Sequence, residues 1–177
     1  MTNYEFTLKF RLPDAATDPG QFVDALGEAG CDDALVGIGQ PGRIALDFSR
    51  EARSAFEAVA SAVMDVRRAI PGAELVEASP DLVGISDVSE LAGCSRQNIR
   101  KLIINHAATF PLAVHEGSPS VWHLANVLEW LVEKDKRRVD VALMEIAETN
   151  MKVNIAKETR RLPGATLPKD LRPLFEP

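Results

Sequence analysis

Residues 82–105 read Leu82-Val-Gly-Ile-Ser-Asp-Val-Ser-Glu-Leu-Ala-Gly-Cys-Ser-Arg-Gln-Asn-Ile-Arg-Lys-Leu-Ile-Ile-Asn105. Ser86 is expected to cap a short helix over 87–92, and Ser95 to cap a second helix over 96–104. Gly93-Cys94 supplies the turn between them. Two short helices joined by a glycine-containing turn are typical of a helix-turn-helix, so this motif is predicted here.

The outward face of the second helix is polar, whereas Ile99, Leu102 and Ile103 face inward at helical spacing. Arginine bonds guanine and glutamine bonds adenine in the major groove of DNA. Arg96 and Gln97 lie at the N-terminal end of the helix, where such motifs approach the bases. Ser95 and Lys101 are better suited to contact phosphates, whereas Arg100 and Asn98 can contact either bases or phosphates. The sequence therefore predicts major-groove reading by helix 95–104, through Ser95, Arg96, Gln97, Asn98, Arg100 and Lys101.

The residues after this helix predict a wing, defined as residues 111–122. Residues 111–114 are expected to form a strand, 115–119 a tight turn and 120–122 the returning strand, followed by a helix from Leu124. Trp122 and Trp130 are expected to pack the wing onto the helices. His115 and Ser118 at the tip are candidate DNA contacts, although the tip has no Arg or Lys. The prediction of DNA binding therefore rests more on helix 95–104 than on the wing.

Residues 82–131 resemble the AlpA/excisionase-like branch of the MerR-type winged helix-turn-helix families. The resemblance implies DNA binding with the second helix in the major groove and the wing on the backbone or minor groove. Leu112-Ala113 departs from the family pattern, in which a second proline is common. The residues that match the pattern are Val83, Gly84, Ser86, Val88, Glu90, Leu91, Gly93, Ser95, Arg96, Gln97, Phe110, Pro111, Val121, Trp122, Val127 and Trp130.

The first 79 residues predict a separate unit with the order β-α-β-β-α-β. Alternating apolar residues indicate strands over 4–11, 34–38, 43–48 and 73–77. One helix is expected around Phe22 to Ala29, and a second is expected to begin after a cap at Ser49. This order is that of the ferredoxin-like arrangement, with one sheet face left for a dimer partner, a ligand or a neighbouring domain. We expect the unit to serve assembly or sensing.

No proline or glycine occurs from Leu124 to Arg161, which predicts one helix or two nearly continuous ones. A stripe at alternating spacings of four and three fits a coiled coil, and a polar residue within it could fix register. The stripe favours a dimer interface, because regulators usually bind two-fold symmetric sites; the alternative is packing against the protein's own N-terminal unit. Its members are Val139, Leu143, Ile146, Asn150 and Val153.

The formal net charge is −6, but it is unevenly distributed. Residues 1–80 account for −6, residues 81–131 for −2 and residues 132–177 for +2. All three basic residues of the middle segment lie between Arg96 and Lys101, and a second basic cluster runs from Lys134 to Arg138. DNA affinity depends on local charge, so this distribution permits DNA binding without arguing for it.

Several classes of protein are not expected. No apolar run is long enough to span a membrane and no secretory signal is visible, so a cytoplasmic location is predicted. Cys31, Cys94 and the three histidines show no metal-ligand or catalytic spacing. We therefore expect neither a cofactor, a metal nor an enzyme.

The sequence thus predicts an α+β protein with four parts: a ferredoxin-like domain over 1–79, a winged helix-turn-helix over 80–131, a long dimerisation helix over 132–161, and a Pro-rich tail over 162–177. The tail is either disordered or an extended clasp that binds a partner. The predicted function is that of a homodimeric, sequence-specific transcriptional regulator or repressor that binds double-stranded DNA. Two alternatives are an antitoxin that neutralises a partner toxin and represses its own operon, and an excisionase or architectural protein that bends DNA.

Overall fold

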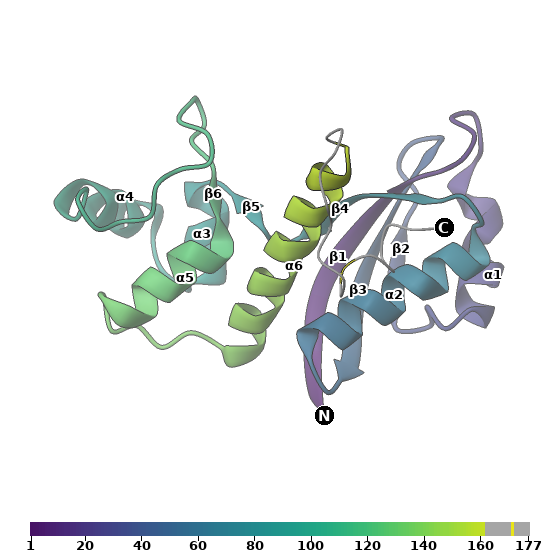
Figure 1. The fold of residues 1–177 in the computed structure, drawn as a ribbon, viewed down its shortest axis with the longest axis horizontal. Helices are drawn as coiled ribbons and strands as arrows, with labels where there is room; N and C mark the ends of the chain where they lie inside the picture. The colour runs from purple at the N-terminus through teal and green to yellow at the C-terminus, as the bar shows by residue number, and fades with distance from the viewer. Residues whose placement is uncertain (162–170, 172–177) are drawn as a thin grey trace.

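The computed structural model describes residues 1–161 and residue 171 and has mixed α+β structure (Figure 1). Two groups of elements lie on either side of helix α6, which is drawn between them. Along the chain the elements are β1 (Thr2–Arg11), a 3-10 turn η1 (Pro19–Phe22), α1 (Val23–Glu28), β2 (Ala34–Gly37), β3 (Arg43–Ala52), α2 (Ala55–Ala69), β4 (Glu74–Ser79), β5 (Leu82–Val83), α3 (Ile85–Leu91), α4 (Arg96–Asn105), β6 (Trp122–His123), α5 (Leu124–Glu133) and α6 (Val141–Arg160).

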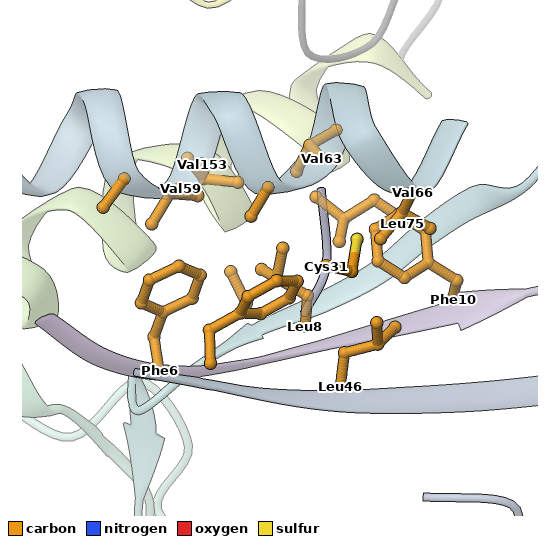
Figure 2. Close-up of a cluster of buried hydrophobic side chains, with 14 of the residues drawn as sticks. Phe6, Leu8, Phe10, Cys31, Leu46, Val59, Val63, Val66, Leu75 and Val153 are labelled. Atoms are coloured by element: carbon orange, nitrogen blue, oxygen red, sulfur yellow. The ribbon is translucent and has the colours of Figure 1, made fainter. Parts of the chain in front are cut away.

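The N-terminal lobe, residues 1–79, is built on a four-stranded sheet in the order β2-β3-β1-β4 with every neighbouring pair antiparallel. Alternation along β1 buries every second residue, because side chains of a strand point to opposite faces. These buried residues face α2, as Figure 2 shows for Phe6, Leu8 and Phe10. The four strands and their order of occurrence match the sequence prediction.

Helix α2 begins later than predicted. β1 pairs with β3 along its whole length, from Arg11 opposite Arg43 to Thr2 opposite Ala52, so β3 continues past Ser49. The hydroxyl of Ser54, not that of Ser49, caps the helix by accepting from the backbone N–H of Glu57. The prediction of a cap at Ser49 is wrong because ladder pairing with the long first strand extends the strand.

The wing is also less regular than predicted. Residues 111–114 form no strand, and the returning segment makes only one isolated bridge, between His115 and Val121. Trp122 and His123 instead form β6 and pair with Val83 and Leu82 of β5. Because Pro111 and Pro119 lack a backbone N–H, they cannot donate to a ladder, and the predicted hairpin is reduced to a loop held at its base.

The long helical stretch is two separate helices. α5 ends at Glu133, α6 begins at Val141 with an Asp140 cap, and Lys136 between them has a φ of 54°. The two helices pack against each other, which the chain achieves only by turning between them. The alternative of two helices is therefore correct, but they are not nearly continuous.

The predicted dimer stripe, which consists of four residues of α6 and Val139 just before it, packs inside the chain itself. Ile146 and Val153 belong to the hydrophobic core of the N-terminal lobe, and Val139 packs against the second core; Leu143 touches both. Asn150 is fully buried and donates to the carbonyl of Pro80. The assignment of this stripe to an interface between protomers is wrong, because its side chains fill space between α6 and the rest of the same chain.

Helix α6 joins two hydrophobic cores. Its residues Val153 and Ala156 complete the core under the sheet, where Val153 lies beside α2 in Figure 2, and its Ala147 enters the core of α3, α4 and α5. Leu171 is also buried in the first core, whereas the predicted tail is otherwise outside the described residues. No helix in the described part of the chain is long and apolar enough to cross a membrane.

Candidate nucleic-acid interface

Helices α3 and α4 are joined by a turn centred on Gly93, whose φ is +61°. A left-handed backbone favours glycine because it has no Cβ. The hydroxyl of Ser95 accepts from the backbone N–H of Asn98 at 3.2 Å, which confirms the predicted cap of α4. The cap of α3 differs from the prediction, since helix α3 begins at Ile85 and the Asp87 carboxylate accepts from the Gly84 N–H. Together these local bonds position α4 at a sharp turn after α3.

Apolar and aromatic side chains support α4 from within. Ile99 is the residue of α4 that is fully buried, with 1% of its surface exposed. Beneath it Phe110 lies between the two tryptophans, with ring centroids 6.2 Å from Trp122 and 5.0 Å from Trp130. The indole N–H of Trp122 donates to the Pro111 carbonyl at 3.1 Å. Trp122 therefore ties the start of the wing to this core, as predicted, whereas the ring contacts of Trp130 are with His106 and Phe110, which precede the wing.

The opposite face of α4 is open to solvent. All six predicted contact residues on this helix are exposed, and they form a continuous run interrupted by the buried Ile99. Arg96, Arg100 and Lys101 make no ion pair or side-chain hydrogen bond within the described residues. Three cations and two amides are thus held on a rigid helix with their donors unused, which is an arrangement that suits an anionic, hydrogen-bonding partner.

The second basic cluster follows α5 directly. Lys134, Lys136 and Arg138 are exposed in the loop that leads to α6. Arg137 is half-buried, and its guanidinium bonds the Asp135 carboxylate at 2.9 Å. The loop therefore offers three cations to solvent, while Arg137 is used to hold the loop.

The wing places its two predicted contacts, His115 and Ser118, at exposed positions. The wing also exposes aliphatic side chains: Leu112 is 84% exposed and Val114 is 55% exposed. Ile104 at the end of α4 is 75% exposed and lines a hollow shared with Leu112. The wing thus presents aliphatic surface where a backbone contact would favour cations.

A buried polar cluster behind the wing was not predicted. The Asp81 carboxylate, 1% exposed, accepts from Nδ2 of Asn154 at 2.8 Å and is 2.6 Å from Nδ1 of His123. Asn154 also exchanges two hydrogen bonds with the backbone of Ala78. These three side chains come from distant parts of the sequence and share no spacing, so only the fold reveals that they meet.

No group of three potential metal-ligating side chains occurs within residues 1–161 and 171. Both cysteines carry free thiols. Cys31 is buried under the sheet, and burial raises the pKa of its thiol to about 11. Comparison with known proteins gives no match to a family model, to a curated protein or to a solved structure.

Proposed function

We propose that this protein is a sequence-specific DNA-binding regulator that reads the major groove with α4. In this proposal residues 80–131 form a winged helix-turn-helix of the AlpA/excisionase-like kind, and residues 1–79 form a ferredoxin-like domain for assembly or sensing. The protein acts as a homodimer in the cytoplasm on double-stranded DNA. The wing assists less than α4 does.

The observation that carries the proposal is the unpaired basic face of α4. Arg96 and Gln97 lie in its first turn, directly after the Ser95 cap, with Arg100 one turn further on the exposed side. Side chains of these types and at this end of a recognition helix contact base edges. Unused guanidinium and ammonium groups on the same face supply the phosphate contacts that position such a helix.

The acidic charge of the whole chain is compatible with this function, because it lies elsewhere. Residues 1–80 carry a net charge of −6, whereas the exposed cations of α4 and of the loop after α5 are clustered. Electrostatic attraction to DNA acts within about one Debye length, roughly 8–10 Å at ordinary salt. Since few phosphates are contacted by one copy, binding by two copies is expected to be needed for tight association.

The experiment is selection of binding sites from random double-stranded DNA with the full chain, followed by titration of variants on the selected site. Arg96→Ala and Gln97→Ala are each expected to weaken binding by about 1–3 kcal/mol, or roughly 5- to 150-fold. Arg43→Ala is the matched control, because Arg43 is an exposed arginine of the N-terminal lobe without an ion pair in the described residues. Unchanged affinity in an Arg96→Ala, Gln97→Ala double variant would refute the proposal.

A second candidate is the antitoxin, and the exposed aliphatic side chains next to α4 favour it. Ile104 and Leu112 lie together at a hollow beside α4, and contiguous exposed apolar surface marks protein-binding sites. In this alternative the wing binds a partner toxin while α4 binds the operator. Leu112→Gln removes the aliphatic surface without adding a charge, so it is expected to weaken partner binding and to change DNA affinity much less than Arg96→Ala does. Co-purification and gel-shift titration measure the two effects separately.

A further inference from the structure

A hollow of about 450 Å³ lies where the N-terminal lobe, the wing and α6 meet. Its apolar walls come from three different segments: Leu82 from β5, Val114 from the wing and Ile155 from α6. Each of these side chains is about half exposed although it is aliphatic. Small-molecule sites are concave, mostly apolar and of this size, with a few placed polar groups.

His123 supplies the polar group of this hollow. Its ring lines the hollow, and its Nδ1 lies 2.6 Å from the buried Asp81 carboxylate. In the tautomer whose single proton lies on Nδ1, Nδ1 donates to this carboxylate and Nε2 is left as an acceptor. Nε2 has no hydrogen-bond partner in the described part of the chain.

The imidazole is held in place from behind. Asp81 is fixed by the 2.8 Å bond from Asn154, and Asn154 is itself bonded to both backbone groups of Ala78. His123 is also the partner of Leu82 in the short β5-β6 ladder. An acceptor that is oriented in advance loses little freedom on binding, which favours recognition of a matching donor.

The charges around the hollow compensate one another. Lys157 and Arg161 both pair with Glu158, at 3.0 and 3.3 Å, and Lys157 also donates to the Val76 carbonyl. Glu77 pairs with Lys9 at 2.9 Å. With the rim charges occupied and the Asp81 charge bonded to His123 and Asn154, the chemistry favours an uncharged ligand over an organic acid or a cation.

We propose that this hollow binds a small, uncharged, mainly apolar molecule that carries one O–H or N–H donor, and that the donor bonds Nε2 of His123. The class includes phenols and small alcohols. Binding would tie the wing, through Val114, to α6, through Ile155. Its effect on DNA affinity rests on the proposed function above, whereas ligand binding itself does not.

The test compares phenol with fluorobenzene, which has a similar shape but no donor, by following the backbone amide resonances of the full chain. Phenol is expected to shift those of Leu82, Val114 and Ile155 with a Kd of about 1 mM or tighter, and at least about tenfold more tightly than fluorobenzene. Absence of shifts at these residues, or equal affinity for the two probes, would overturn the proposal.

Two variants separate the donor contact from the shape of the hollow. His123→Asn retains a donor near Asp81 but removes the Nε2 acceptor, so it is expected to equalise the affinities for phenol and fluorobenzene. Val114→Trp fills the rim while leaving the Asp81–His123 pair intact, and is expected to abolish binding of both probes. Val141→Trp, at an exposed position of α6 away from the hollow, is the control and should bind phenol as the unmodified chain does.

A separate experiment tests whether ligand binding changes DNA affinity. With the selected DNA site, saturating phenol is expected to change affinity by at least about threefold, and the change should vanish in Val114→Trp. If the chain binds DNA and saturating phenol has no effect, the coupling is wrong. If the chain binds phenol but no DNA, the proposed function fails and the ligand site stands.

Discussion

The basic side chains of the N-terminal lobe and those of α4 differ in whether they have partners within the chain. In the N-terminal lobe most form ion pairs, and Arg50 is the extreme case: buried at 7% exposure, it bonds the carboxylates of Asp33 and Asp65 and the carbonyl of Gly30. In α4 the three cations are exposed and have no such partners among the described residues. The N-terminal lobe uses its positive charge to hold its own fold, whereas α4 leaves its charge available to another molecule.

The same contrast separates stability from binding. Removing one partner of a buried ion pair leaves an unpaired charge and lowers the free energy of unfolding by several kcal/mol. Exposed cations contribute little to that free energy. Substitutions in the two regions should therefore affect two different properties of the protein. Those in the N-terminal lobe and in the α6 residues it buries are expected to change the free energy of unfolding, and those in α4 to change DNA affinity.

Val153→Asp should have the largest effect. Val153 is fully buried between α6 and the sheet, so the new carboxylate would enter an apolar core and lower the free energy of unfolding by about 4 kcal/mol or more. Urea denaturation measures this loss. An unchanged free energy of unfolding would contradict the burial of Val153 in the core of the N-terminal lobe.

Arg50→Ala comes next. It removes the partner of Asp33 and Asp65, and is expected to reduce the free energy of unfolding by about 3–5 kcal/mol. Arg96→Ala is the matched change in the other region and should stay within about 0.5 kcal/mol of the unmodified chain. Equal losses in the two variants would show that α4 also uses its arginine to stabilise the fold.

How far the sequence predicts the molecule also differs between the two regions. The alternation in β1 and β3 and the Ser95 cap of α4 predict their elements because the deciding interactions are local or periodic. Ser49 and the wing were predicted wrongly, since pairing with distant strands overrides local preference.

The stripe on α6 shows a different limit. Its periodicity correctly identifies a helix with a buried face, but the period says nothing about whether the covering surface belongs to the same chain or to a second copy. Asp81, His123 and Asn154 show a third limit, because a contact among three isolated residues leaves no pattern in the sequence.

A smaller effect is expected from Lys101→Ala, which removes a predicted phosphate contact. The slope of log K against log salt should fall in magnitude by about 1, with a similar loss for every DNA sequence. Lys9→Ala is the control, because Lys9 is held by Glu77 in the N-terminal lobe. A slope that changes equally in both variants would place DNA on the sheet as well as on α4.

The smallest expected effect is a difference in reactivity between the two thiols of the unmodified chain. Cys31 is buried and the pKa of its thiol is raised to about 11, whereas Cys94 lies half-buried in the turn before α4. Because the thiolate is the reactive form, Cys94 is expected to react with a disulfide reagent at about pH 8 while Cys31 reacts only on unfolding. Rapid reaction of both thiols in the folded chain would show that the N-terminal core opens readily.

In the proposed function α4, and not the N-terminal sheet, contacts DNA. Mapping amide chemical shifts of the full chain during titration with its selected double-stranded site tests this directly. We predict shifts concentrated at residues 95–101, with smaller ones at the wing, and none on the outer face of the sheet. Shifts centred on β1 and β3, with the resonances of α4 unchanged, would show that the sheet and not α4 binds DNA.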